Sequence, residues 1–219
     1  MDITAEVLTA DQRCACMMVL DTSGSMQGDS IDALNQGLAA FEAQVKSNAL
    51  AARRIEVGII TFGGDGVRLN QDFLQARNFV APVLAAGGVT PMGEAVQLAV
   101  QAIRNRKNEF RQLGVQYYRP WLMLITDGEP TDEGWEQAAE LVRREETQKA
   151  LTCFPIGVGS QVNLAKLAQF STRRPMSLNG LDFEEMFVWL SSSLGKVSAS
   201  GPGNMIELPP VDSWASLSV

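Results

Sequence analysis

The sequence contains no histidine, and its 219 residues include only three cysteines. Without an imidazole, a serine hydrolase would lack its usual general base, and a structural zinc site would need carboxylates, which is uncommon. An odd number of cysteines does not form an even disulfide framework. Cys14 and Cys16 lie two residues apart in an apolar segment, so we expect small buried side chains on one side of a strand rather than a redox or soft-metal pair.

Long hydrophobic runs and long basic runs are also missing. No segment approaches the ~20 apolar residues of a membrane span, so we predict no membrane span. Residues 1–6 lack the basic region and apolar core of a secretory signal, and we therefore expect a cytoplasmic location. The net charge is −7, and most of the 18 basic residues occur singly or in pairs. This charge argues against nucleic acid as a main partner.

Hydrophobic residues make up 46% of the chain. Continuously apolar segments alternate along it with segments in which apolar residues recur every three or four positions. Strands are predicted at residues 14–20, 55–62, 67–73, 120–126, 151–158 and 176–178. Helices are predicted at residues 30–49, 93–108, 133–149, 163–170 and 182–197. Continuously apolar strands that alternate with helices indicate an α/β fold, a Rossmann-like doubly wound sheet that is mainly parallel with helices on both faces. Residues 67–73 follow a Gly-rich turn and are expected to pair back as one antiparallel edge strand.

The chain is expected to form one domain with short extensions. Residues 1–12 form a polar N-terminal lead-in, residues 13–197 form the domain, and residues 198–219 form a tail containing Pro and Gly. The tail cannot continue the last helix, because it contains Gly201-Pro202-Gly203 and Pro209-Pro210. It is either loosely ordered or extended over the domain.

Oxygen-bearing side chains follow the first predicted strand at a spacing of two. These are Asp21, Ser23 and Ser25, and two later segments add Thr90 in a Gly-rich loop and Asp127 at the end of the strand 120–126. In open α/β sheets, ligand sites lie outside the carboxyl ends of the strands, so we expect the three segments to share one rim. Hard divalent cations prefer such oxygen ligands. Alternatively, residues 21–25 form only a tight turn with a helix cap.

The three segments, in this order, resemble the metal-ion-dependent adhesion site of von Willebrand factor type A (vWA) domains. The pattern there is Asp-x-Ser-x-Ser, a Thr in a Gly-rich loop and an Asp that ends a later strand, and the resemblance covers residues 13–197. It implies that Ser23 and Ser25 bind the metal directly, that Thr90 binds directly or through water, and that Asp21 and Asp127 bind through water. Mg²⁺ suits this arrangement because it keeps several waters, while Mn²⁺ and Ca²⁺ remain open.

A narrower resemblance rests on short segments: Arg13-Cys14-Ala15-Cys16 before the Asp21 loop, the loop at residues 88–93, and the Pro-rich tail. These segments are similar to those of the bacterial TerY-like family, which is associated with tellurium resistance and stress-response gene clusters. The resemblance implies a cytoplasmic protein partner that presents Asp or Glu to the metal. It also suggests a phosphatase or a kinase-like protein of the same gene cluster as that partner.

Three functions follow as hypotheses. The first is a non-enzymatic interaction module that binds a partner's acidic residue through the metal. The alternative is a metal-dependent phosphatase or hydrolase, against which stand the absence of histidine, of a Gly-x-Ser-x-Gly elbow and of a Walker loop. A third is an intramolecular switch, in which the helix 182–197 moves or Glu207 or Asp212 of the tail occupies the metal.

Other acidic residues near these segments are expected to have structural or solvated roles. Asp132 is predicted to cap the helix 133–149. Four further carboxylates are expected on the same rim as solvated charges: Asp29, Glu94, Glu129 and Glu133.

Overall fold

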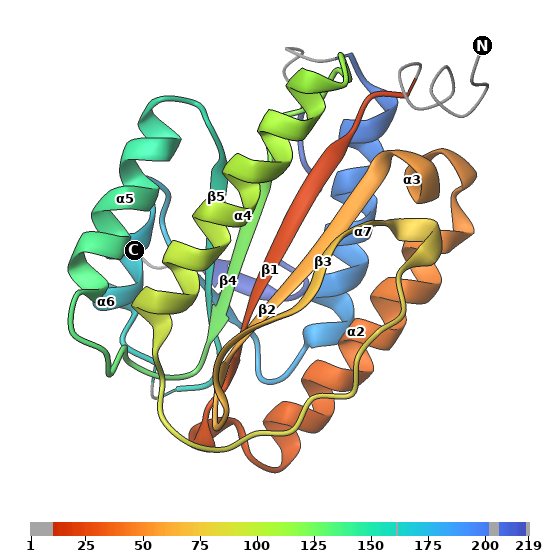
Figure 1. Cartoon of the computed structure of the whole chain (residues 1–219). Helices are drawn as coiled ribbons and strands as arrows, with labels where there is room; N and C mark the ends of the chain where they lie inside the picture. The colour runs from red at the N-terminus through yellow and green to blue at the C-terminus, as the bar shows by residue number, and fades with distance from the viewer. Residues whose placement is uncertain (1–10, 161, 202–205, 218–219) are drawn as a thin grey trace.

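The computed structural model describes residues 11–160, 162–201 and 206–217. Most of the predicted lead-in, residues 1–10, therefore lies outside the described residues. In the described part, a seven-stranded sheet of order β3-β2-β1-β4-β5-β6-β7 runs through the centre of the fold (Figure 1).

The sheet is mainly parallel, as predicted. Neighbouring strands are parallel from β2 to β6, and the strand at each edge is antiparallel to its neighbour. The strands are β1 (Cys14–Thr22), β2 (Ile55–Gly63), β3 (Gly66–Gln75), β4 (Trp121–Thr126), β5 (Thr152–Gly157), β6 (Met176–Leu178) and β7 (Ala215–Leu217). Every residue of β1, β2, β4 and β5 is buried, which explains their continuous apolar runs. The α/β fold class is confirmed. The edge strand β3 was expected, whereas β7 was not.

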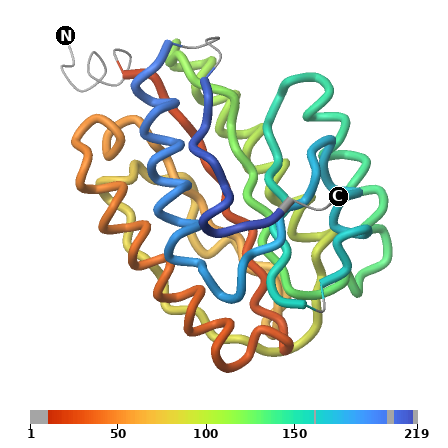
Figure 2. The backbone as a smooth tube through the Cα atoms, turned by 180° about the vertical axis from the view of Figure 1, so that it is seen from behind, coloured from red at the N-terminus to blue at the C-terminus, as the bar shows by residue number. Residues whose placement is uncertain are grey.

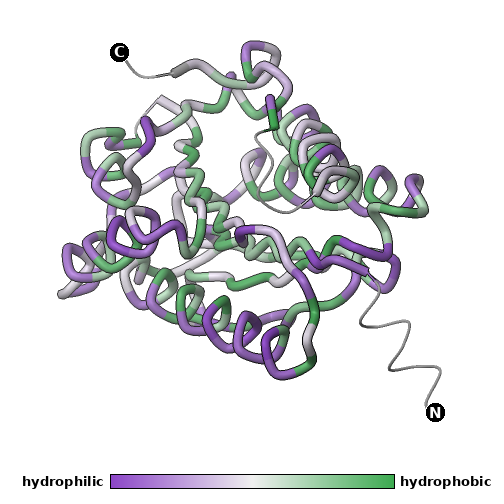
Figure 3. Tube along the Cα trace, turned by 90° about the horizontal axis from the view of Figure 1, so that it is seen from above, coloured by the Kyte–Doolittle hydropathy of each residue, from purple (hydrophilic) through white to green (hydrophobic). Residues whose placement is uncertain are grey.

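Helices cover both faces of the sheet. On one face lie α2 (Asp29–Ser47), α3 (Ala49–Arg54) and α7 (Phe183–Ala199), and on the other lie α4 (Met92–Gln112), α5 (Trp135–Thr147) and α6 (Leu164–Leu167). Single 3₁₀ turns occur at Gly24–Met26, Ala76–Asn78 and Ala168–Phe170. The buried side chains form two clusters, one on each face, and Figure 3 shows hydrophobic segments inside and hydrophilic ones on the outer helices. None of the described helices is long and apolar enough to span a membrane.

Helices α2 and α7 pack closely because α2 has a glycine at their contact. A Cβ atom on Gly37 would lie 2.7 Å from Cδ2 of Phe187 and 2.9 Å from Cβ of Phe183. The Phe187 ring also packs against Phe41, with ring centroids 5.9 Å apart. The absence of a side chain at position 37 therefore sets the distance between the two helices.

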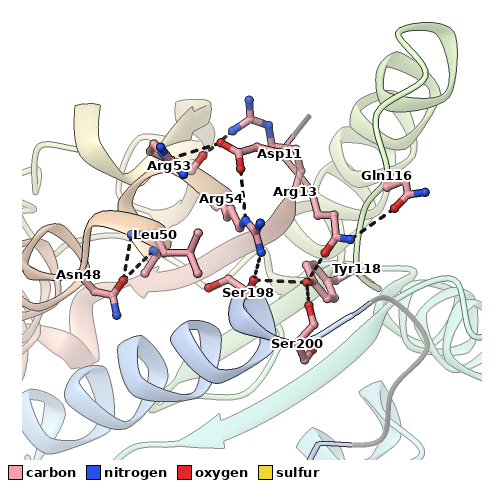
Figure 4. A network of polar contacts seen from close by, with 12 residues as sticks. Asp11, Arg13, Asn48, Leu50, Arg53, Arg54, Gln116, Tyr118, Ser198 and Ser200 are labelled. Carbon is pink, nitrogen blue, oxygen red and sulfur yellow. Dashed lines mark hydrogen bonds and ion pairs between the residues drawn. The ribbon is translucent and has the colours of Figure 1, made fainter. Parts of the chain in front are cut away.

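The carboxyl end of α7 is held by side chains from two other segments (Figure 4). Arg54 Nη1 donates a hydrogen bond of 2.6 Å to the carbonyl of Ser198, and the Tyr118 hydroxyl lies within hydrogen-bonding distance of the carbonyls of Ser198 and Ser200. Arg54 also pairs with Asp11 at 3.4 Å. These contacts satisfy carbonyl groups that a helix end leaves without partners, and the guanidinium charge complements the helix dipole.

The part of the tail that the structure describes beyond residue 205 lies extended over the domain, the second of the two alternatives. Residues 206–217, here called the strap, cross the α7 side of the sheet (Figure 2). Trp189 Nε1 of α7 donates to the Pro209 carbonyl at 2.8 Å, and the Asn179 amide donates to the Trp214 carbonyl at 2.8 Å. Trp214 is fully buried. The strap ends as β7, which explains the second antiparallel edge.

Two local predictions need correction or completion. The helix expected at residues 30–49 ends at Ser47, because Asn48 leaves the helical conformation and caps a separate helix, α3, accepting hydrogen bonds of 3.0 Å from the Leu50 and Ala51 amides. The three cysteines are free and buried, as expected. Burial raises the pKa of Cys14 to about 12, so this thiol stays protonated at neutral pH.

Candidate metal-binding site

Two adjacent strands carry the central residues of the candidate site to the same edge of the sheet. Asp21 lies near the end of β1, and Asp127 directly follows β4, which pairs with β1 through Leu20 and Ile125. Their carboxyl ends meet because the two strands are parallel. The rim predicted from the alternation of strands and helices is therefore present at this edge.

A chain of hydrogen bonds joins both carboxylates through the two serines. Asp127 Oδ1 accepts from Ser25 Oγ at 2.6 Å, and the hydroxyl oxygens of Ser25 and Ser23 lie 3.1 Å apart. Asp21 Oδ1 accepts from the Ser23 amide at 2.8 Å, and Asp21 Oδ2 accepts from Thr126 Oγ1 at 2.5 Å. Each carboxylate oxygen of Asp21 is thereby fixed, which orients the loop that follows β1.

Thr90 reaches this group from a third loop. Two hydrogen bonds join its backbone to Thr131. The Thr131 amide donates to the Thr90 carbonyl at 2.9 Å, and the Thr131 hydroxyl accepts from the Thr90 amide at 3.0 Å. A Cβ atom on Gly128 would lie 3.6 Å from Thr90 Oγ1 and 3.8 Å from Ser25 Oγ. The two hydroxyls therefore face one small space, which a side chain at position 128 would fill.

Glycines hold the loops of Asp21 and Thr90 together. The Gly24 amide donates to the Gly88 carbonyl at 3.0 Å, and the Gly87 amide donates to the Thr22 carbonyl at 2.8 Å. Gly88 has a φ of +72°, and a Cβ atom there would lie 2.4 Å from the Gly64 Cα. A larger residue at position 88 would be strained and would collide with the turn between β2 and β3.

The site passes from buried to open across these residues. Asp21, Ser23 and Thr90 are buried, Asp127 is partly buried and Ser25 is exposed. Burial raises the pKa of Asp21, while hydrogen bonds from Ser23 and Thr126 oppose the rise and the nearby charge of Asp127 adds to it. Two carboxylates and three hydroxyls thus lie at one partly open position.

This set of donors fits a hard cation that accepts hydroxyl and water ligands. In the described part of the chain, no three His, Cys, Asp or Glu residues form a group that could hold a metal by themselves. A metal here would therefore need the hydroxyls of Ser23, Ser25 and Thr90 besides the carboxylates. Such oxygen donors suit Mg²⁺ better than zinc or copper.

Two neighbours of the site have roles that the sequence did not indicate. The sequence predicts Thr126 only as the last residue of a strand, but its hydroxyl donates to Asp21 Oδ2 and also accepts from the Gly128 amide at 3.1 Å. Asp132 was expected to cap the helix after it, and this was wrong. Its carboxylate caps α4 instead, accepting from the Gly93 and Glu94 amides at 3.1 and 2.9 Å. The free amides of α4 lie beside this loop only in the folded chain.

One of the other acidic residues is engaged by a neighbouring element. Glu129, two residues after Asp127, accepts from Asn163 Nδ2 at 2.7 Å and forms an ion pair with Lys166. The side chain is exposed, and the hydrogen bonds from Lys166 and Asn163 lower its pKa. Glu129 therefore links the loop after β4 to the region of α6.

The family model of the von Willebrand factor type A domain matches residues 17–187. A search of curated proteins gives no match. Among solved structures, proximal thread matrix protein 1 from the mussel byssus is similar at 18% identity and a TM-score of 0.55, over 84% of this chain and 48% of the other. The pilus adhesin SpaC from Lactobacillus rhamnosus GG is similar at 13% identity and a TM-score of 0.67, over 85% and 31% of the two chains.

The manganese-loaded TRAP protein of Plasmodium vivax is similar at 20% identity and a TM-score of 0.52, over 75% of this chain and 64% of the other. The chain thus spans about half of the mussel protein and about a third of SpaC. At these identities, the similarity shows the fold alone.

Proposed function

Because the chain belongs to the von Willebrand factor type A domain family, we propose that it is a non-enzymatic interaction module. It binds an acidic residue of a partner protein through a divalent metal, Mg²⁺ in the first instance. The observation that carries the proposal is the hydrogen-bonded series Asp127, Ser25, Ser23 and Asp21, with the Thr90 hydroxyl facing the same space.

Ser23, Ser25 and Thr90 would hold the metal through their hydroxyl oxygens, and Asp21 and Asp127 would act through water. Both oxygens of Asp21 already accept hydrogen bonds, which supports an orienting role for this carboxylate. When bound, the metal supplies a positive charge that a partner's Asp or Glu can neutralise. The exposed Ser25 lies where the site opens to solvent, so a partner can approach from that side.

An enzymatic function gains no support from the residues of this site. The sequence has no histidine to act as a general base, and the hydroxyls of Ser23 and Ser25 are bonded to each other and to a carboxylate rather than to a base of neutral pKa. Two of the similar structures are described as a pilus adhesin and a byssal matrix protein, which are not enzymes by those names. These features favour binding over turnover.

The proposal extends to a cytoplasmic role in a bacterial tellurium or stress-response system. The support for this narrower part is the resemblance of residues 13–16, the Asp21 loop, residues 88–93 and the tail to TerY-like proteins. The partner would then be a phosphatase or a kinase-like protein of the same gene cluster.

Metal binding is tested first by titrating Mn²⁺ into the full chain. Electron paramagnetic resonance measures the free ion at each step, and Mg²⁺ is then added as a competitor. We expect one site per chain, and a loss of affinity of about tenfold or more in Ser25→Ala and in Asp127→Asn. Glu140→Gln is the matched control. Glu140 is exposed on α5, and its replacement removes one negative charge, as Asp127→Asn does. Equal affinity in all four proteins would overturn the metal site.

Partner binding is tested by capture from a bacterial lysate with the tagged full chain in Mg²⁺, in EDTA, and as Asp21→Ala/Ser25→Ala in Mg²⁺. A protein captured only by the unchanged chain with Mg²⁺ is the expected result. Capture of this partner should be lost when the Asp or Glu with which the partner contacts the metal is replaced by Asn or Gln. A partner kept in all three conditions would contradict recognition through the metal.

A further inference from the structure

The strap leaves a pocket on the α7 side of the sheet that the proposed metal site does not use. Its volume is about 400 Å³, within the range of small-molecule sites. The lining is apolar and aromatic apart from two arginines, Arg173 and Arg174. The apolar part comprises Phe154, Pro155, Met176, Trp189, Leu208, Pro209 and Val211.

The apolar wall of this pocket belongs to a fixed aromatic cluster. The rings of Phe154 and Trp189 meet edge to face, with centroids 6.0 Å apart, and Trp189 packs on the buried Trp214 at 5.2 Å. The Trp189 indole is further held by its hydrogen bond to Pro209. A strap rather than a helix covers this part of the sheet, and the strap residues Leu208, Pro209 and Val211 line the pocket.

A buried carboxylate holds the backbone that leads into the two arginines. Glu146 accepts from the Ser171 hydroxyl at 2.8 Å and from the Thr172 amide at 2.6 Å, and the Ser171 hydroxyl in turn accepts from the Arg173 amide at 2.9 Å. The Arg173 guanidinium lies over the Phe154 ring, 5.4 Å from its centroid. Because Glu146 also accepts from the Cys153 amide of β5 at 2.8 Å, the backbone of residues 171–173 is fixed against β5.

These arginines form an uncompensated positive patch on an acidic protein. Both are exposed, and in the described part of the chain no carboxylate lies within ion-pair distance of either. The chain as a whole has a net charge of −7. A guanidinium pair beside an apolar pocket is complementary to an anion attached to an apolar body, because the guanidinium fork matches a carboxylate.

We propose that this pocket, here called the strap pocket, binds a small amphipathic anion that places an aromatic or branched apolar body against Trp189 and Met176 and its carboxylate on Arg173 and Arg174. The site is independent of the metal site, since it is built from other elements of the fold. Binding should therefore persist in EDTA and in Ser25→Ala.

The test uses two probes of equal shape, 2-naphthoate and the uncharged 2-naphthamide, titrated into the full chain by calorimetry. We expect saturable binding of naphthoate, with the indole N–H signal of Trp189 shifting in ¹H–¹⁵N spectra. The affinity for naphthamide should be lower by about tenfold or more, because naphthamide cannot form an ion pair with the guanidinium groups.

Variants then separate this pocket from general anion binding. Arg173→Gln/Arg174→Gln should lose about tenfold in naphthoate affinity with unchanged naphthamide affinity. Arg143→Gln/Arg144→Gln is the matched control, because it removes two exposed charges from α5. Equal affinities for both probes, equal losses in both double variants, or no saturable binding of naphthoate would each overturn the proposal.

Discussion

At the scale of single residues, buried carboxylates have different tasks in this protein. Asp21 and Glu146 are both buried and both accept several hydrogen bonds. Asp21 lies at the open rim, beside hydroxyls that remain available to a ligand. Glu146 is surrounded by the donors that it satisfies, which come from β5 and from residues 171–172. The first carboxylate is suited to binding and the second to stability.

Replacing Glu146 tests the second role. Glu146→Ala leaves the Cys153 amide, the Thr172 amide and the Ser171 hydroxyl without their acceptor. We expect the free energy of unfolding to fall by about 3 kcal/mol or more, because each is a hydrogen bond to a charged group. Urea denaturation measures this change in the free energy of unfolding. Glu140→Ala, exposed on the same helix, should cost no more than about 0.5 kcal/mol. Similar losses in the two variants would contradict this role.

At the scale of the elements, the packing of α2 on α7 depends on one glycine. The two helices touch where Gly37 faces Phe183 and Phe187. Both helices were predicted from their apolar periodicity, but the distance between them depends on side chains brought together from distant parts of the chain. Glycine lowers the intrinsic stability of a helix, so its presence at position 37 reflects this close contact.

Two glycine-to-alanine variants should therefore have opposite effects. In Gly37→Ala, the new methyl group meets the Phe183 backbone and the Phe187 ring, and we expect a loss of about 1–3 kcal/mol. In Gly195→Ala, on α7, the Cβ atom meets nothing within 4 Å, and a gain of up to about 1 kcal/mol is expected. Thermal and urea unfolding of both variants measure the difference. Stabilisation by both substitutions would show that α2 and α7 are not in close contact at position 37.

At the scale of the whole molecule, the candidate site joins loops that are distant in sequence. The segments after β1 and after β4 and the loop before α4 converge, so a metal bound there would link elements from both halves of the chain. A ligand that binds only the folded state raises the free energy of unfolding in proportion to the logarithm of its concentration. The stability of the domain should therefore report on occupancy of the site.

Under the proposed function, Mg²⁺ at a hundred times its dissociation constant should stabilise the domain by about 2.7 kcal/mol. For a chain of this length, this corresponds to a rise in Tm of about 5–10 °C. Differential scanning calorimetry with and without EDTA measures the shift. A tenfold weaker site would keep about half of this stabilisation at the same Mg²⁺ concentration. Ser25→Ala should therefore lose half of the shift or more, while Gly195→Ala should keep it, because position 195 lies on α7 away from the hydroxyl groups. The same shift in Ser25→Ala would indicate that Mg²⁺ binds elsewhere.

Features that depend on neighbours along the chain follow from the amino-acid sequence alone. The apolar runs of β1, β2 and β4 predict buried parallel strands, and a helical periodicity predicts α2, α4 and α7, because each pattern follows from the geometry of one element. The order of the Asp21, Thr90 and Asp127 segments likewise predicts a shared rim, since the carboxyl ends of parallel strands meet at one edge.

Features that depend on partners far apart in sequence arise only when the chain folds. Asp132 caps α4 rather than α5, Thr126 holds Asp21, and the strap contributes β7, because their partners come from other elements. The strap pocket has the same origin, since Arg173, Trp189 and Val211 meet only when the segment before β6, helix α7 and the strap pack together. Local sequence patterns specify single helices and strands. The cap of α4, the strap and the strap pocket depend on how these elements pack against one another.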